Sequence, residues 1–298
     1  MPTATETRSV DPTRTSVLRK RYAQHYRAMW RRVNTTINEY VDSVDFSQPL
    51  ALRMIEFNRF VDTLLQHEFG RTENDRERGV RAMAMAAYMR GIAQANTEVE
   101  EEMPPAQQAV YQPDHNDAIG ALILLLSTQL MSVRTGLAGQ LLQQYQQANG
   151  ATDAKAALRK QIQKAGRMPT DGIAADGVVR GYNDALLNVY EAAGLQFVGV
   201  VEEKAFFQTA EDRRVCAQCY RASQRTDNGF GPGIYTISQA RGLIPLHNRC
   251  RCRWRRLPPG LPASHGTQPA GRTRQAASWR VPVELALQYR NVQGLRRR

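Results

Sequence analysis

All four cysteines of this 298-residue chain lie in two short segments, and the second segment also contains a histidine. Cys216 and Cys219 form a Cys-x2-Cys pair, and His247, Cys250 and Cys252 follow about thirty residues later. Thiolates and imidazoles are the ligands that tetrahedral zinc prefers, and four of them fill a structural site. The sequence therefore predicts one Zn²⁺ per chain, bound by Cys216, Cys219 and two of the other three residues.

Two other states of the cysteines fit the same spacing. The four thiols could stay reduced and buried, or they could pair as two disulfides. The first fifteen residues, MPTATETRSVDPTRT, lack the apolar core of a secretory signal, so we expect no export by the general route and favour the metal over the disulfides. His247 competes with Cys252 for the fourth position, because five candidate ligands surround a four-coordinate ion.

The alternative function for this cluster is catalytic, as a metal-dependent nuclease or another DNA-processing enzyme. A zinc deaminase needs a His-x-Glu sequence and a Pro-Cys-x-x-Cys sequence, whereas His247 is followed by Asn248 and Arg249. A nuclease could recruit Glu211 and Asp212 with His247, yet polar residues beside a metal commonly orient its ligands. Because four protein ligands leave zinc no open position, we expect no catalytic residues and no enzymatic activity.

The residues around the cluster resemble the phage Mu F-like minor head proteins, also called phage head morphogenesis proteins. The similar segments, over about eighty residues, are Tyr-Glu-Ala-Ala-Gly at 190–194, an apolar stretch from Phe197, TAEDRRVCAQC ending at Cys219, and PLHNRCRC ending at Cys252. The resemblance implies a structural minor head protein in the virion of a tailed bacteriophage. Such a protein is associated with the portal and acts in capsid assembly, head morphogenesis or DNA packaging and delivery.

The resemblance also implies partners and a location. The expected partners are the portal protein, the major capsid or scaffold protein, and viral DNA bound without sequence specificity. Neither a membrane nor a small-molecule substrate is expected. The protein would be found in the host cytoplasm during assembly and in the head near the portal vertex afterwards.

The net charge of +12 is concentrated at the two ends of the chain. Residues 1–32 carry eight Lys or Arg against two acids, and residues 251–298 carry eleven Arg against one, so the body between them is mildly acidic. Basic segments attract DNA and acidic protein surfaces, although a solvated helix face explains any one arginine equally well. The predicted contacts are Arg19, Lys20, Arg21, Arg27, Arg31, Arg32, Arg296, Arg297 and Arg298. We find no recognition helix that would read a DNA sequence.

Helical periodicity dominates the chain up to Gly194. Apolar residues recur every three or four positions from Leu18 to Tyr40, with Ser16 as the N-cap. Further helices are predicted from Pro49 to Gly70, from Asp75 to Ala95, from Pro113 to Gly150, from Thr152 to Gly166 and from Thr170 to Gly194. The run Ala118 to Met131 is too short for a membrane span, and its apolar character on two sides predicts a helix at the centre of a bundle.

Beyond Gly194 the pattern changes to short β-branched segments. Strands are predicted at 195–201, with 205–207 continuing it or pairing with it, and at 234–237, followed by one helical turn capped by Ser238. Cys250 and Cys252, two apart in a strand, would point to the same side.

The expected fold is mainly α with a small α+β C-terminal module. Its predicted parts are a flexible lead at 1–15, an N-terminal helical region at 16–102, a central helical region at 113–194, a zinc-knot-like Cys/His module at 195–257, and a linker with an extended basic arm at 258–298. The acidic segment 98–102, followed by Pro104 and Pro105, is predicted to be a linker that ends the first helical region.

Overall fold

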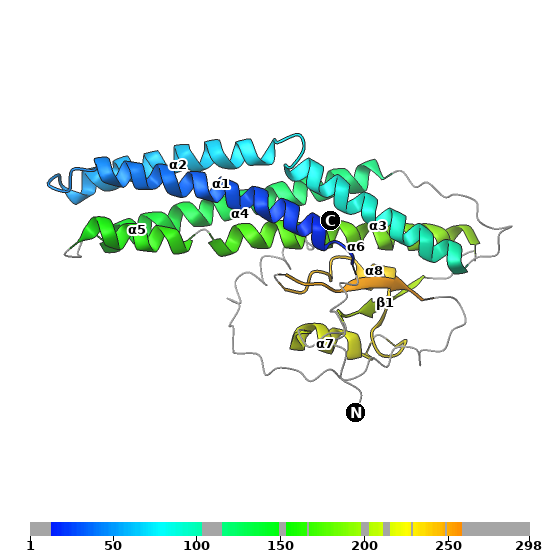
Figure 1. Ribbon diagram of the computed structural model, residues 1–298. Coiled ribbons are helices and arrows are strands. Elements are labelled where there is room, and N and C mark those ends of the chain that lie inside the picture. The colour runs from blue at the N-terminus through cyan, green and yellow to red at the C-terminus, as the bar shows by residue number, and fades with distance from the viewer. Residues whose placement is uncertain are drawn as a thin grey trace, which may run out of the picture.

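The computed structural model describes residues 13–102, 115–148, 153–165, 167–197, 203–210, 215–227, 229–247 and 249–257. Within these ranges the chain is mainly helical, as predicted, with a small module packed against one side of a long bundle (Figure 1). The predicted basic arm at 258–298, with Arg296, Arg297 and Arg298, lies outside the described residues, as does most of the lead at 1–15.

Six helices build the bundle. They are α1 (Ser16–Ser43), α2 (Leu50–Glu73), α3 (Val80–Glu102), α4 (Asn116–Ala148), α5 (Ala154–Ala165) and α6 (Arg167–Phe197). Helices α2 and α3 follow one another along the bundle, and so do α5 and α6, while α1 and α4 contact all four of them. The bundle therefore has a four-helix cross-section, with α2 and α5 at one end and α3 and α6 at the other.

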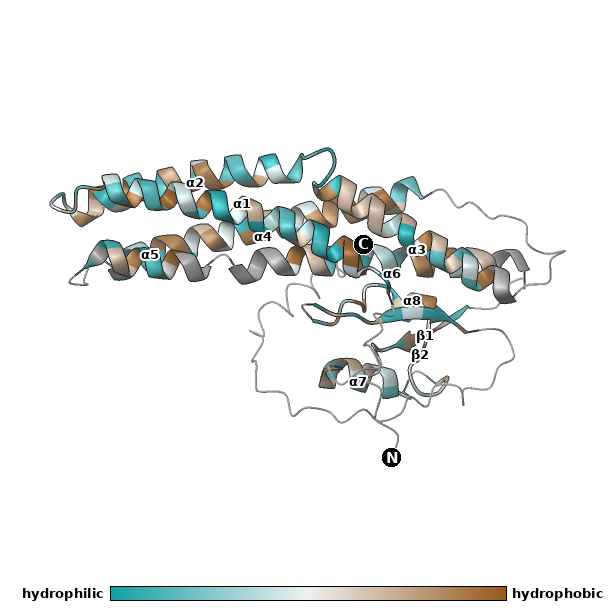
Figure 2. Cartoon of the chain, viewed as in Figure 1, coloured by the Kyte–Doolittle hydropathy of each residue, from teal (hydrophilic) through white to brown (hydrophobic). Residues whose placement is uncertain are grey.

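One hydrophobic core runs through the bundle. The apolar stripe predicted on α1 is confirmed, because Tyr22, Tyr26, Val33 and Ile37 are all buried against it. In Figure 2 the bundle helices carry both hydrophobic and hydrophilic residues, which is the pattern of helices that bury one face. Helices α3 and α6 approach most closely at Gly91, where an added Cβ would lie 2.3 Å from the Tyr182 carbonyl oxygen.

Several predicted helix boundaries are wrong. Helix α2 continues past Gly70 to Glu73, and α3 includes the segment 98–102 that was predicted as a linker. Helix α6 begins before Thr170 and continues past Gly194, so residues 195–197 are helical rather than a strand, and 198–201 lie outside the described residues. A glycine inside a helix costs only about 1 kcal/mol, which tertiary packing readily outweighs.

Helix α4 buries only one face in the bundle, whereas its apolar character on two sides predicted burial on both. Leu122, Leu126 and Leu130 are buried, but Leu124 is 70% and Met131 46% exposed. By length and composition α4 is apolar enough to cross a membrane, and 17% of its most apolar window is buried. One face of α4 therefore packs in the core while another stays outside.

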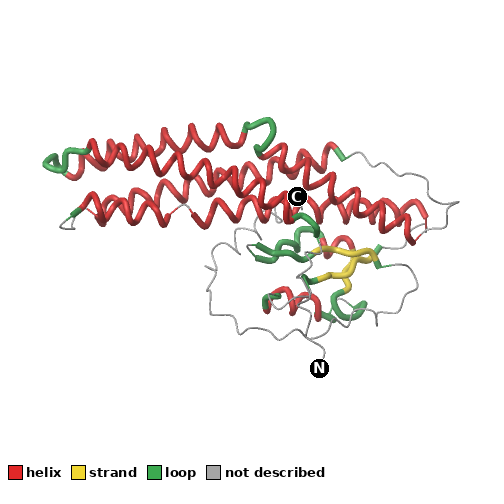
Figure 3. The backbone as a smooth tube through the Cα atoms, in the orientation of Figure 1, coloured by secondary structure: helices red, strands yellow, loops and turns green. Residues whose placement is uncertain are grey.

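The module consists of β1 (Lys204–Gln208), α7 (Ala217–Gln224), β2 (Ile234–Thr236), α8 (Ile237–Ala240) and β3 (Arg253–Arg256). Its strands form an antiparallel sheet in the order β2-β1-β3, drawn in yellow in Figure 3. The predicted strand at 205–207 is confirmed as β1, although it pairs with β2 and β3, and the one at 234–237 is confirmed as β2 except for Ile237, which begins α8. The single turn of α8 is capped by Thr236 in a capping box with Gln239, and not by Ser238.

A second core joins the module to the bundle. Trp254 of β3 packs edge-on against Phe207 and Tyr235, with ring centroids 5.3 Å away in both cases. Leu186 and Tyr190 of α6 belong to this same buried cluster. Helix α6 therefore contributes to both cores, and it is the element on which the module rests.

Candidate metal centre

The first pair of cysteines is positioned by helix α7. Cys216 is the N-cap residue of this helix, and its sulfur accepts a hydrogen bond from the backbone N–H of Cys219 at 3.4 Å. Because the N-cap and the third helical residue lie at the same helix end, the Cys-x2-Cys spacing places both sulfurs side by side. This half of the cluster is thus built by a local element.

The second half lies in an irregular segment before β3. The Cys250 N–H donates to the His247 carbonyl at 3.1 Å, which closes a tight turn between these two predicted ligands. Cys252 immediately precedes β3, so the prediction that Cys250 and Cys252 lie within a strand is wrong. Both cysteines are nevertheless buried in the same core.

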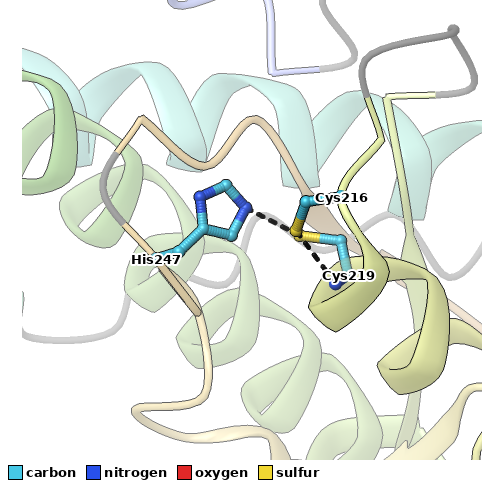
Figure 4. Close-up of side chains that lie close together, drawn as sticks. All are labelled: Cys216, Cys219 and His247. Carbon is cyan, nitrogen blue, oxygen red and sulfur yellow. Dashed lines mark hydrogen bonds between the residues drawn. The ribbon is translucent and has the colours of Figure 1, made fainter. Parts of the chain in front are cut away.

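All five predicted ligands come together, in two groups that share Cys219. One group is Cys216, Cys219 and His247, and the other is Cys219, Cys250 and Cys252. Within each group the ligand atoms lie within 4.8 Å of one another. Figure 4 shows the His247 ring directed at the Cys216–Cys219 pair, and its Nε2 lies 3.0 Å from the Cys219 sulfur.

The separation between the Cys219 and Cys250 sulfurs fits a tetrahedral metal. The Cys219 and Cys250 sulfurs are 3.8 Å apart. Two thiolates at a zinc–sulfur distance of about 2.3 Å and a tetrahedral angle would be about 3.8 Å apart. All four cysteines are free thiols, and Cys219, Cys250 and Cys252 are buried. Sulfur and imidazole donors favour zinc or another soft or borderline ion over Mg²⁺ or Ca²⁺.

The crowded thiols shift one another's pKa values in opposite directions. Hydrogen bonds with Cys219 and then with His247 lower the pKa of Cys216 to about 4. Contacts with Cys219 and Cys252 lower the pKa of Cys250 far below its usual range, whereas contacts with Cys216 and Cys250 raise that of Cys219. A bound cation would replace the protons of these thiols, because the deprotonated thiolate is the metal ligand.

Two residues of helix α6 complete the surroundings of the cluster. The Arg249 N–H donates to Asp176 Oδ1 at 3.0 Å, and Asn183 exchanges hydrogen bonds with the backbone at Cys252 and Trp254. Burial raises the pKa of Asp176 to about 7. We did not predict either residue, because a polar residue on a helix carries no local sign of a partner about seventy positions away.

The acidic residues considered for a nuclease, Glu211 and Asp212, lie outside the described residues. His247, the third member of that set, belongs to the cysteine cluster instead. The structure therefore brings His247 to sulfur ligands.

The six basic residues predicted on α1 do not share one environment. Lys20, Arg27 and Arg31 are exposed, as is Arg21, which donates to the Glu77 carbonyl. Arg19 and Arg32 are half-buried, and Arg32 forms an ion pair with Glu68 at 2.7 Å. Lys20, Arg27 and Arg31 are spaced by seven and four residues, so they form one exposed basic stripe along the helix.

No protein-family model, curated protein or solved structure matches the chain. Its function therefore has to follow from its own residues. The feature with the most definite chemistry is the group of four thiols and one imidazole, in which Cys219, Cys250 and Cys252 are buried and Cys216 and His247 are half-buried.

Proposed function

We propose that the chain is a structural minor head protein of a tailed bacteriophage, and that its Cys/His cluster binds one Zn²⁺ as a structural metal centre. The main support for the metal site is that Cys216 and Cys219 lie close to His247, Cys250 and Cys252. The phage role is supported by the resemblance of the segments ending at Cys219 and Cys252 to the Mu F-like family. The same resemblance implies a position near the portal vertex.

The burial of three of the five candidate ligands supports a structural centre over a catalytic one. Cys219, Cys250 and Cys252 are at most 3% exposed, and a catalytic zinc needs an open position for water or substrate. Four protein ligands would leave no such position. Zinc bound here would cross-link the start of α7 to the segment before β3.

The short elements of the module suggest that a cross-link contributes to its stability. Its strands are five, three and four residues long, and its helices eight and four. Small folds with little core of their own commonly depend on a metal or disulfide for stability. Much of the free energy of metal binding would then appear as free energy of folding.

The charge of the module supports an anionic partner. Its described residues between 203 and 257 include nine Lys or Arg but only Glu203 and Asp227 as acids. Together with the exposed basic stripe of α1, this charge favours DNA or an acidic protein surface. Viral DNA, the portal protein and the major capsid or scaffold protein are the partners of these kinds that a minor head protein meets during assembly in the host cytoplasm.

Elemental analysis of protein purified under reducing conditions tests the metal centre. We expect about one zinc per chain and a lower melting temperature after chelation. Cys219→Ser, which removes the ligand shared by both groups, should lose the metal, whereas Gln218→Ser on the exposed side of α7 should retain it. Metal-free wild-type protein with an unchanged melting temperature in chelator would exclude the site.

Reconstituted heads test the assembly role. The protein should co-sediment with portal-containing heads, and deletion of residues 281–298 should remove it from them. Replacing Arg296, Arg297 and Arg298 should weaken incorporation in a salt-dependent way, most at low salt, because screening at high salt already reduces the charge attraction that these residues supply. Heads that assemble normally without the protein would contradict the proposal. Metal-dependent cleavage of DNA by the purified protein would instead favour the nuclease alternative.

A further inference from the structure

The described residues of the segment that carries His247, Cys250 and Cys252 belong to no helix or strand. The segment precedes β3, and Arg249 within it adopts a φ of 63°, which residues other than glycine rarely do. The Cys216–Cys219 half of the cluster, by contrast, is fixed by helix α7. The second half therefore requires support from elsewhere in the fold.

Helix α6 supplies hydrogen-bond partners for the backbone of this segment. Asp176 Oδ1 accepts the N–H of Arg249, the residue in the left-handed conformation, at 3.0 Å. Seven residues later, Asn183 Oδ1 accepts the Trp254 N–H at 2.8 Å, and its Nδ2 donates to the Cys252 carbonyl at 3.3 Å. Residues seven apart lie on one face of a helix, so Asp176 and Asn183 present two fixed contacts.

The two contacts flank Cys250 and Cys252. Arg249 lies between His247 and Cys250, and Asn183 bonds the backbone on both sides of Arg253, the residue after Cys252. Asn183 is 1% exposed and also donates to the Val179 carbonyl at 2.8 Å, so its amide is held in one orientation. A loop that is already held in its binding geometry loses less conformational entropy when the metal binds.

We propose that Asp176 and Asn183 are positioning residues that preorganise the second half of the metal centre on helix α6. This inference rests on the proposed metal centre and extends it. The metal affinity of the module then depends on a helix of the bundle. By thermodynamic linkage, metal binding would in turn stabilise the packing of the module against α6.

The proposal is tested by the zinc affinity of the full chain. This affinity is measured by competition with a chromophoric chelator in reducing buffer. Asp176→Leu and Asn183→Leu should each weaken zinc binding about 10- to 100-fold, which is typical for residues that orient metal ligands. Asp176→Asn keeps an acceptor oxygen and should bind zinc nearly as tightly as the wild type. Asn188→Leu is a matched control on α6, because Asn188 contacts Tyr88 and Arg241 instead.

Cobalt replacement separates positioning from general stability. In Asp176→Leu, the Co²⁺ absorption bands should shift or weaken, because the ligand geometry changes. Asn188→Leu should leave them unchanged even if it lowers the melting temperature. Zinc affinities within twofold of the wild type for both leucine variants, with unchanged Co²⁺ spectra, would overturn the proposal.

Hydrogen exchange in the metal-free protein tests the positioning role separately from zinc binding. The Arg249 and Trp254 amides should exchange slowly in the wild type and faster in Asp176→Leu and Asn183→Leu respectively. Because Asn183 is buried, circular dichroism must show that its variant folds, and Asp176→Leu carries the test if it does not. Unprotected amides in the wild type would refute the positioning role, whereas protected amides without zinc binding would refute only the metal centre.

Discussion

Glu98 of α3 and Arg253 of β3 form a buried ion pair, in which an Arg253 guanidinium nitrogen lies 2.6 Å from Glu98 Oε1. Gln94 donates to the same carboxylate oxygen, and the Tyr190 hydroxyl donates to the other. The group joins α3, α6 and β3 one residue after Cys252. The pair therefore connects the metal-binding segment to a part of the bundle that the sequence predicted to be a linker.

Removing one partner of this pair should strongly destabilise the protein. Glu98→Ala leaves the Arg253 charge buried without its counter-ion, which typically costs about 3–5 kcal/mol. Glu98→Gln keeps the hydrogen-bond geometry and should cost less. Urea unfolding of the two variants measures the difference, and a double-mutant cycle with Arg253→Ala gives the coupling energy. Losses below about 1 kcal/mol for Glu98→Ala would contradict a buried pair.

Two glycine substitutions should change stability in opposite directions. At Gly91 a new Cβ would lie 2.3 Å from the Tyr182 carbonyl oxygen, so Gly91→Ala should force α3 and α6 apart and cost about 1–3 kcal/mol. At Gly136 of α4 a Cβ meets nothing within 4 Å, and Gly136→Ala should stabilise the helix by about 0.5–1 kcal/mol. Thermal unfolding of the Gly91→Ala and Gly136→Ala variants measures both changes in stability. Equal effects would mean that α3 and α6 do not approach closely.

The carboxyl of Asp184 should make stability depend on pH. Burial raises its pKa from 3.8 to about 6, with Arg180 and Arg241 opposing the shift. The folded state thus holds this proton more tightly than the unfolded state, and the resulting stability is lost as pH rises from about 4 to about 6. Asp184→Asn should match the wild type near pH 4 and exceed it by about 3 kcal/mol above pH 6. Urea unfolding of both proteins across this pH range measures the difference in unfolding free energy. A difference that does not change with pH would contradict a raised pKa of Asp184.

The exposed basic stripe of α1 should contribute to DNA binding without sequence preference. Lys20→Glu combined with Arg31→Glu should weaken binding to unrelated DNA sequences alike. It should also reduce the slope of log affinity against log salt by about 2, because two phosphate contacts are lost. Arg59→Glu, on the exposed face of α2, is the control. Gel shifts at several salt concentrations measure these effects, and an unchanged slope would remove the stripe from the interface.

Arg32 should behave differently from the stripe. Because its guanidinium pairs with Glu68, whose side chain is 9% exposed, Arg32→Glu should lower stability by placing two carboxylates together. Its melting temperature should fall, whereas that of the Lys20 and Arg31 variant should change little. If Arg32→Glu weakened DNA binding with no loss of stability, the ion pair would not form in solution.

The sequence by itself determined the features that depend on residue type and local spacing. The apolar period of three to four predicted the core-facing stripe of α1, and the confinement of all four cysteines to two segments predicted which residues converge. The strands β1 and β2 followed from short apolar, β-branched and aromatic runs at 205–207 and 234–237. These signals are local, because side-chain direction repeats with the geometry of a helix or strand.

Tertiary structure decided the features whose cause lies far away in the chain. Glu98 is helical and buried because it pairs with Arg253, 155 positions later, and no pattern near Glu98 indicates this. Gly194 does not end α6, because the helix packs against β3 and its neighbours and this packing outweighs the intrinsic cost of glycine. Asp176 and Asn183 are ordinary polar residues in sequence. They acquire a role only because folding brings the backbone of Arg249, Cys252 and Trp254 within hydrogen-bonding distance of α6.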